Sequence, residues 1–265
     1  MKIGFIGCGN MASAIIKGII CNKVADCKDI YAYDISSKAA SKAKSEYNIN
    51  ICDSEADTAQ SVDILFLAVK PNVIGSVIET LSDTLKSNNP LVISIAAGKT
   101  LEYLSACSKS EFKLVRVMPN INAKVGESIC AYCSNSLVTD DDIAVVSKIL
   151  SGIGKVLALD ESYFPLFGVL GGCGPAFAYM FIDAMARAGV KNGMKKEDAL
   201  KIAAQTVYGS AKMILESDEH PWKLIDNVCS PGGTTIEGVT SLQADGFENA
   251  IHNAVDKALD KDKKL

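Results

Sequence analysis

The chain has 265 residues, which is enough for one large domain or two smaller ones with substantial cores. It is 48% apolar and 22% charged, and its 27 basic and 31 acidic residues leave no cationic excess. This composition is typical of a soluble globular protein and argues against disorder, nucleic-acid binding and attraction to an anionic membrane.

The first residues, "MKIGFIG", lack the basic region, apolar core and cleavage site of a secretory signal. Nine cysteines form an odd and scattered set, which indicates reduced thiols and a cytoplasmic location rather than a disulfide framework. Only Cys130 and Cys133 make a C-x-x-C pair, and no histidine cluster accompanies them, so no metal site is expected.

The first half alternates short apolar runs with amphipathic stretches, a pattern that predicts β-α-β units on a parallel sheet. Helices are expected at residues 11–22 and 37–47. The predicted strands are residues 2–7, 29–34, 63–69, 91–96, 113–119, 127–133 and 155–160.

A glycine-rich turn directly follows the first predicted strand and leads into a predicted helix. Glycines let the backbone turn tightly and approach a pyrophosphate, whose charge is met by the helix N-terminus. The pattern is G-x-G-x-x-A, formed by Gly7, Cys8, Gly9, Asn10, Met11 and Ala12. In this context it predicts a dinucleotide site in a Rossmann-type domain, although a turn that binds nothing is the alternative.

The acidic residue Asp34 ends the second predicted strand. Its carboxylate can accept hydrogen bonds from the adenosine ribose hydroxyls, whereas it would repel a 2'-phosphate. This residue therefore favours NADH over NADPH.

Three further loops follow predicted strands and should lie at the same edge of the sheet. We expect cofactor contacts from the first two, and from the third a contact to the nicotinamide or the substrate through Asn120. A solvated loop lysine is the alternative for Lys70. The residues concerned are Ala68, Val69, Lys70 and Pro71, then Ala97, and finally Asn120.

From about residue 164 the strand pattern gives way to helical periodicity, as in residues 176–190 and 196–217. We place the boundary so that residues 1–160 bind the dinucleotide and residues 161–265 form a helical domain, with a ligand cleft between them. The uncharged run at residues 162–182 approaches membrane-spanning length, but prolines and glycines interrupt it. A buried segment, broken in the middle, is expected there.

The chain resembles the pyrroline-5-carboxylate reductase family almost from end to end. The motifs that carry this resemblance are "IGFIGCGNMASAI", "LAVKP", "VRVMPN", "GGCGPAF", "DAMARAGV" and, most specifically, "HPWKLIDNVCSPGGTTIEGVTSL". The resemblance implies that NAD(P)H reduces the C=N bond of 1-pyrroline-5-carboxylate to give L-proline. It also implies a homodimer with interlocked helical domains, which in relatives often assembles into a ring of dimers.

The stretch "SPGGTT" gains a role from this resemblance. Its glycines let backbone N–H groups approach a ligand, and its threonines open a predicted helix, so together they suit a substrate carboxylate. An ordinary helix connection capped by Thr234 or Thr235 is the alternative. The resemblance assigns substrate binding to Ser230, Gly232, Gly233, Thr234 and Thr235.

Among these residues, the resemblance makes Thr235 the expected partner of the imine nitrogen and the catalytic candidate, either as a proton donor or as an orienting group. Upstream, Asp218 is expected on the substrate side of the loop. By the same resemblance, Asn227 matches a family position near the cofactor of the partner subunit, whereas His220, before a proline, favours a structural role.

The chain also departs from the family pattern near the adenosine. Members that use NADPH often have Asn-Arg-Ser/Thr after the second strand, where this chain has Asp34, Ile35 and Ser36. Glu55 would add a second carboxylate in that corner. Both changes make a 2'-phosphate costly, although Lys38 could offset part of the repulsion, and they strengthen the expectation of NADH.

Two other functions remain open on sequence grounds. One is a reductase of another cyclic imine, or a β-hydroxyacid dehydrogenase, although the predicted helix at 176–190 lacks the lysine that the latter needs. The other is an NAD(H)-sensing module without turnover, which would need the glycine-rich turn but not "SPGGTT".

Overall fold

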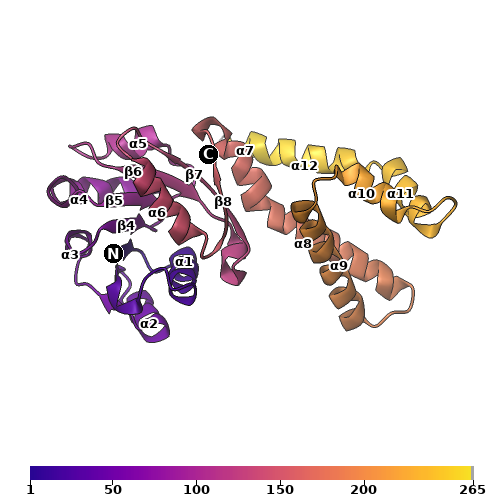
Figure 1. The fold of residues 1–265 in the computed structure, drawn as a ribbon, viewed down its shortest axis with the longest axis horizontal. Helices are drawn as coiled ribbons and strands as arrows, with labels where there is room; N and C mark the ends of the chain where they lie inside the picture. Colours follow the sequence, from indigo (N-terminus) through magenta and orange to yellow (C-terminus); the bar gives the residue numbers. More distant parts are fainter. Residues whose placement is uncertain (264–265) are drawn as a thin grey trace. The chain divides into compact units, whose positions relative to one another are not determined.

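The computed structural model describes residues 1–263, and these form two compact units that meet at residues 172 and 173. The first unit is built on a β-sheet with helices on both faces, and the second contains helices alone (Figure 1). The predicted fold class, a Rossmann-type parallel-sheet domain followed by a helical domain, is confirmed.

The sheet has eight strands in the order β3-β2-β1-β4-β5-β6-β7-β8. All neighbouring pairs are parallel except β6 and β7, which are antiparallel. The two-residue β3 was not predicted. The strands are β1 (Ile3–Ile6), β2 (Ile30–Tyr33), β3 (Asn50–Ile51), β4 (Ile64–Leu67), β5 (Leu91–Ser94), β6 (Leu114–Met118), β7 (Ser128–Ser134) and β8 (Gly154–Ala158).

Helices cover the two faces of this sheet and bury alternate residues of each strand. On one face Phe5 and Phe66 pack with α1 and α6, and on the other Leu65 and Leu67 pack with α4 and α5. The helices are α1 (Asn10–Cys21), α2 (Ser37–Tyr47), α3 (Glu55–Gln60), α4 (Ile74–Asn88), α5 (Leu101–Ala106), α6 (Asp140–Leu150) and α7 (Phe164–Phe167). Short 3-10 turns are η1 (Cys27–Asp29), η2 (Ile121–Val125) and η3 (Glu161–Tyr163).

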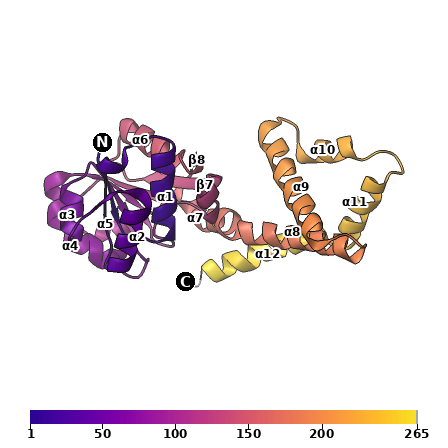
Figure 2. The same ribbon diagram turned by 90° about the horizontal axis from the view of Figure 1, so that it is seen from below.

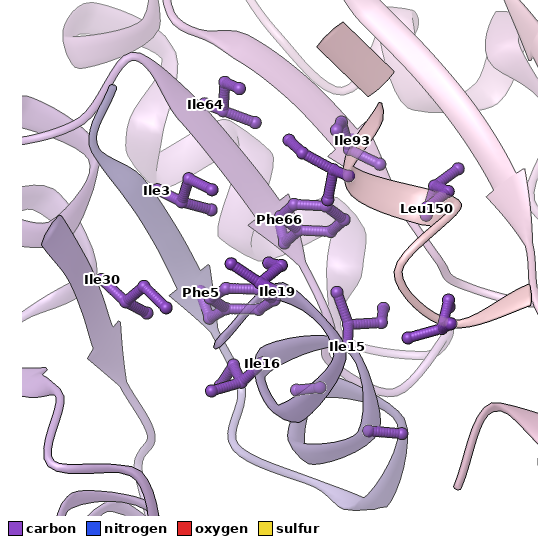
Figure 3. Close-up of a cluster of buried hydrophobic side chains, with 14 of the residues drawn as sticks. Ile3, Phe5, Ile15, Ile16, Ile19, Ile30, Ile64, Phe66, Ile93 and Leu150 are labelled. Carbon is purple, nitrogen blue, oxygen red and sulfur yellow. The ribbon is translucent and has the colours of Figure 1, made fainter. Parts of the chain in front are cut away.

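The largest cluster of buried side chains fixes α1 against the strands that carry the glycine-rich turn. Ile15, Ile16 and Ile19 recur at helical spacing and meet the stacked rings of Phe5 and Phe66, whose centroids are 4.7 Å apart (Figure 3). Burying five such side chains stabilises this contact by about 1.5–3 kcal/mol each. The N-terminus of α1 is therefore held firmly at the sheet edge.

The segment that joins the two units is continuously helical, against the prediction of a break. After α7 comes η4 (Gly168–Cys173), a π-helical turn, which runs directly into α8 (Gly174–Lys191). Pro165 lies in the first turn of α7 and Pro175 in the first turn of α8, so each proline falls where one helical type gives way to the next.

The second unit consists of α8 with four further helices, which Figure 2 shows from below. Its buried core is small: Ala186, Ala199 and Ala203, with the half-buried Ile182. A ring contact between Phe181 and Phe247, 5.9 Å apart, joins α8 to α12. The other helices are α9 (Lys196–Glu216), α10 (Pro221–Val228), α11 (Thr234–Ala244) and α12 (Phe247–Asp262).

Many large apolar side chains of this helical unit are exposed, including Met180 at 78%, Leu215 at 80% and Val228 at 65%. Within the described residues, one helical stretch, Glu161–Lys191, is long and apolar enough to cross a membrane by length and composition, and 11% of its most apolar part is buried. Phe164 and Phe167 are buried as expected, but most of α8 is exposed. The prediction of a buried segment at residues 162–182 therefore holds for its first turns. It is wrong for the part that belongs to α8, which is mostly exposed in the single chain.

Candidate active site

The sheet brings the first predicted cofactor residues together where its strand order reverses. β1 lies between β2 and β4, and the hydrogen-bond ladder continues past all three strands: Gly7 N–H donates to Tyr33 O and Ala68 N–H donates to Ile6 O, each at 2.8 Å. Open α/β sheets bind ligands in the crevice at such a reversal. We call this carboxyl-terminal side of β1, β2, β4, β5 and β6 the cofactor edge.

The two glycines of the turn serve different purposes. Gly7 has φ +101°, and a Cβ there would come within 2.5 Å of Ala68 O, so the neighbouring loop excludes any side chain. Gly9 is exposed, and an added Cβ would meet nothing within 4 Å. Gly7 is therefore required by the fold itself, whereas Gly9 leaves open space in front of α1.

The N-terminus of α1 is free to bind an anion. Its N-cap is Gly9, no side chain caps the first turn, and no acidic residue lies in that turn. Asn10 and Met11 instead line a small cavity of about 100 Å³ with Ile121 of η2. The unpaired N–H groups and the helix dipole together suit a phosphate group.

Asp34 ties the end of β2 to the glycine-rich turn. One carboxylate oxygen accepts the N–H of Cys8 at 2.7 Å, and the other accepts the N–H of Ser36 at 2.8 Å. Each oxygen keeps a second lone pair for a ribose hydroxyl. Burial, together with the charge of Asp34, raises the pKa of the Cys8 thiol to about 12, so Cys8 stays protonated and is no nucleophile.

Two further side chains lie beyond the ends of β2 and β3. Ile35 is 93% exposed, although it is a large apolar residue. Glu55 begins α3 and is half-buried, and burial raises the pKa of its carboxyl above the usual value. Its negative charge is thus already disfavoured, and a further anion close to it would be costly.

The loops after β4 and β5 lie at the same edge. Ala68 and Val69 are half-buried, and the Lys70 side chain extends into solvent. Ala97 is exposed, while Lys99 lies over the Tyr103 ring at 4.4 Å. Pro71, half-buried, leads into the turn before α4. These loops therefore present mainly backbone and the exposed Lys70 ammonium group at the cofactor edge.

Asn120 differs from the other predicted cofactor residues because its carboxamide is already engaged. It is only 5% exposed, its Nδ2 donates to Gly171 O at 2.9 Å, and its Oδ1 accepts the N–H of Asn122 at 3.2 Å. Its own N–H donates to Ser128 Oγ at 3.1 Å. Asn120 thus joins three segments inside the first unit.

An ion pair between the buried Arg116 of β6 and the half-buried Glu161 of η3 was missed by sequence reasoning. Arg116 donates to Glu161 Oε1 at 2.8 Å and lies over the Phe164 ring at 4.4 Å, and the same oxygen accepts the N–H of Leu101 at 2.7 Å. Burial, then the charge of Glu161, raises the pKa of the nearby Cys133 thiol to about 12. An arginine inside the apolar run "LVRVM" was the available signal, because a buried charge needs a partner.

In the second unit the loop before α11 leaves the N-terminus of that helix without a side-chain cap. Gly232 adopts φ +66°, and Gly233 N–H donates to Ser230 O at 3.0 Å. The N-cap of α11 is Gly233 and no side chain caps the helix, so neither Thr234 nor Thr235 plays the alternative capping role. A Cβ on Gly233 would strike Ser230 Oγ at 2.3 Å.

The residues upstream of that loop include one engaged pair. Asn227 Nδ2 donates to Glu219 Oε2 at 3.2 Å, and Asp218 is exposed. His220 caps α10 by accepting the N–H of Trp222 at 3.3 Å, as its predicted structural role requires. Residues 1–263 contain no cluster of three or more His, Cys, Asp or Glu side chains suited to a metal ion.

Comparisons with known proteins match both parts of the chain. The family model "Pyrroline-5-carboxylate reductase dimerisation" matches residues 161–265, and the model "NADP oxidoreductase coenzyme F420-dependent" matches residues 2–98. Pyrroline-5-carboxylate reductase of Escherichia coli is 42% identical over 265 residues, which cover 100% of this chain and 98% of that protein. The Methanosarcina acetivorans protein of the same name is 39% identical over 264 residues, which cover 100% and 97%.

Solved structures agree in fold. The pyrroline carboxylate reductase of Plasmodium falciparum with NADP bound has a TM-score of 0.87 at 36% identity, and the match covers 100% of this chain and 97% of that chain. A pyrroline-5-carboxylate reductase from Coxiella burnetii has a TM-score of 0.94 at 30% identity, with coverage of 99% and 97%. The similarity therefore extends over both units.

Proposed function

Because the chain belongs to the pyrroline-5-carboxylate reductase family, we propose that it transfers hydride from NADH to the C=N bond of 1-pyrroline-5-carboxylate and releases L-proline. It is an NAD(P)H-dependent oxidoreductase that acts on an imine. The observation that carries the proposal is the match over all 265 residues, since the cofactor edge and the "SPGGTT" loop both lie within it.

The cofactor would be held by the first unit. The free N–H groups of α1 bind its pyrophosphate, and Asp34 accepts hydrogen bonds from the adenosine ribose. The loop residues Ala68, Val69, Lys70, Pro71 and Ala97 line its path, as does Glu55 at the adenosine end. When bound, the nicotinamide supplies the hydride.

The substrate would be held by the loop before α11. Its carboxylate accepts hydrogen bonds from the uncapped N–H groups of α11 and from Ser230, while Gly232 and Gly233 keep the approach free of side chains. Thr235 donates to the imine nitrogen, Asp218 borders the pocket, and Asn227 approaches the cofactor. Orienting a protonated imine is the principal task of these residues, since an iminium accepts hydride readily.

We propose NADH as the preferred cofactor. Asp34 is fixed by two backbone N–H groups and cannot turn away from a 2'-phosphate, and Ile35 offers no charge to offset the repulsion. The preference is measured as kcat/KM for NADH against NADPH, and an equal or higher value for NADPH would contradict it.

We also propose a homodimer with interlocked helical domains, able to assemble into a ring of dimers. The exposed apolar side chains of α8, α9 and α10 support this, because three buried alanines make a weak core for five helices.

We propose that the dinucleotide-binding domain ends at residue 160 and that the helical domain begins at residue 161. We also propose a cytoplasmic location, because the nine cysteines of the chain carry free thiols.

The direct test uses purified protein, NADH and 1-pyrroline-5-carboxylate, with the absorbance of reduced cofactor followed over time. We expect oxidation that depends on the imine and yields proline. The six-membered homologue of the imine serves as the comparison substrate. Binding of NADH without turnover of either imine would instead indicate a sensing module.

A further inference from the structure

The loop after β5 is anchored at both of its ends. It runs through residues 95–100 and joins β5 to α5 at the cofactor edge. At its start, Ile95 N–H donates to Leu67 O at 3.2 Å. At its end, Leu101 N–H donates to Glu161 Oε1 at 2.7 Å. A side chain that is far away in the sequence therefore ties the second end of the loop.

The same oxygen of Glu161 also contacts the strand beside the start of the loop. Arg116 donates to Glu161 Oε1 at 2.8 Å, is only 5% exposed and lies over the Phe164 ring at 4.4 Å. Within the sheet, Arg116 pairs in register with Ser94, the residue of β5 that directly precedes the loop. One carboxylate therefore links the two ends of the loop, through Arg116 and Leu101.

The middle of the loop is exposed. Ala97 and Gly98 face solvent, and a Cβ added at Gly98 would meet nothing within 4 Å. Such a loop can present its backbone to a ligand when a rigid scaffold holds its ends. Every residue that holds these ends lies in the first unit, Met1–Gly172, so the form of the loop is set within that unit.

We propose that Glu161 is a positioning residue for the cofactor: by accepting the Leu101 N–H while it is paired with Arg116, it holds the loop at residues 95–100 ready for the dinucleotide. The inference rests on the proposed function, in which Ala97 lines the path of the cofactor. A loop without this anchor would have to be ordered when the cofactor binds, and that ordering costs affinity.

Two substitutions of Glu161 separate the contact to the loop from the ion pair. Glu161→Gln keeps an oxygen that can accept from both Leu101 N–H and Arg116, and it removes only the negative charge. Glu161→Ala removes the acceptor and the charge together. Both variants leave the buried Arg116 without a counter-charge, so both should lower the Tm. Only the alanine variant should weaken the binding of NADH.

Asp142 provides a matched control near the start of β6. Its Oδ2 accepts the Thr139 N–H at 2.9 Å and lies 2.8 Å from the ammonium of Lys113, the residue before β6. One carboxylate oxygen again meets a backbone N–H and a cation, but neither partner belongs to the loop after β5. Asp142→Ala therefore breaks an equivalent arrangement and leaves that loop anchored.

The experiment measures the Kd of NADH by calorimetry and the Tm by thermal unfolding. We expect Glu161→Ala to raise the Kd by about fivefold or more, the effect of one lost hydrogen bond. Glu161→Gln and Asp142→Ala should lower the Tm but keep the Kd within about twofold of the wild-type value.

The alanine variant may be replaced by a double variant if it does not fold. Arg116→Met combined with Glu161→Ala removes the unpaired buried charge, yet still leaves the Leu101 N–H without its acceptor. We expect the same rise in the Kd of NADH for this protein, and a wild-type Kd would overturn the inference.

Equal Kd values for Glu161→Ala and Glu161→Gln would also overturn it, as would an equal rise in the Kd for Asp142→Ala. A wild-type protein that binds no NADH would refute the proposed function together with this inference. Wild-type protein that binds NADH and reduces the imine, with an unchanged Kd in Glu161→Ala, would refute this inference alone.

Discussion

Two neighbouring residues after β2, Asp34 and Ile35, differ in how far the fold restrains their side chains. The Asp34 carboxylate accepts two backbone N–H groups, at 2.7 and 2.8 Å. The Ile35 side chain is 93% exposed, so a different side chain can replace it without a clash. A substitution at Ile35 should therefore change the cofactor contact without disturbing the fold.

Ile35→Arg should raise kcat/KM for NADPH relative to NADH by about tenfold or more, because a guanidinium can pair with a 2'-phosphate in two hydrogen bonds. Steady-state kinetics with both cofactors measures the change. Ile35→Gln is the control, as it has a polar side chain without the charge. The same ratio for the arginine and glutamine variants would rule out charge as the cause.

Thr235→Ala should lower kcat/KM for the imine by at least about tenfold, the effect of losing one positioned hydrogen bond in the transition state. Thr240→Ala on the same helix is the control, since the Thr240 hydroxyl only donates to Ile236 O and Glu237 O. Kinetics of Thr235→Ala that match those of Thr240→Ala would remove Thr235 from the mechanism.

The environment of a residue can be predicted from the sequence when it depends on the local chain alone. The turn at Gly7 and the position of Asp34 directly after β2 could be predicted from the order of the residues after two strands. The engagement of Asn120 could not, because Gly171 and Ser128 reach it only through tertiary packing. Pattern and spacing carry no information about such partners.

At the level of elements, α6 shows how one residue pair can make a helix sensitive to pH. Thr139 and Asp142 form a capping box, and Lys113 donates to Asp142 Oδ1 at 3.2 Å while its ammonium lies 2.8 Å from Asp142 Oδ2. Burial alone would raise the pKa of Asp142, but the hydrogen bonds from Lys113 and Thr139 outweigh it and lower the pKa below its usual value.

Since this pKa is lower in the folded protein than in the unfolded chain, Asp142 stabilises the fold at neutral pH and loses that effect as the pH falls through the folded-state pKa. Asp142→Asn should therefore lower the Tm at pH 7, by the equivalent of about 1 kcal/mol, and the difference from wild type should shrink in acid. Thermal melts across pH measure this. Asp141→Asn, on the same turn, is the control, because the capping box is formed by Thr139 and Asp142. An equal loss of Tm at pH 7 in the two variants would point to general helix charge instead.

The strands that consist of long apolar runs were predicted correctly from the sequence. The prediction failed for very short strands and for elements whose form depends on neighbouring segments. β3 has only two residues, too few for a pattern. The reversal of β7 was not predicted, although the short link between Met118 and Ser128 cannot hold the crossover that parallel strands need. At η4 the glycines and prolines resembled a break, because sequence alone does not distinguish a helix start from a helix end at Pro175.

At the scale of the whole molecule, the two units differ in how many large apolar side chains each one buries within itself. The first unit buries large aromatic and aliphatic clusters, whereas the second buries little more than three alanines among the described residues. Sequence periodicity predicted the helices of the second unit, but it could not predict that their apolar faces stay exposed within one chain.

The helical unit should therefore unfold in a transition whose midpoint rises with protein concentration, because a folded partner stabilises it by mass action. The first unit should unfold in a transition with a constant midpoint. Calorimetry over about a hundredfold range of concentration separates the two. Two midpoints that are both independent of concentration would contradict a dimer held by these helices.

The difference between Gly7 and Gly9 bears on how such a motif can change through evolution. A side chain at residue 7 would strike Ala68 O even with no cofactor bound, whereas one at residue 9 would enter open space. A descendant that lost its cofactor would have to keep Gly7 merely to fold, but could replace Gly9 freely. The second glycine, rather than the first, therefore reports whether selection for nucleotide binding still acts on a chain of this fold.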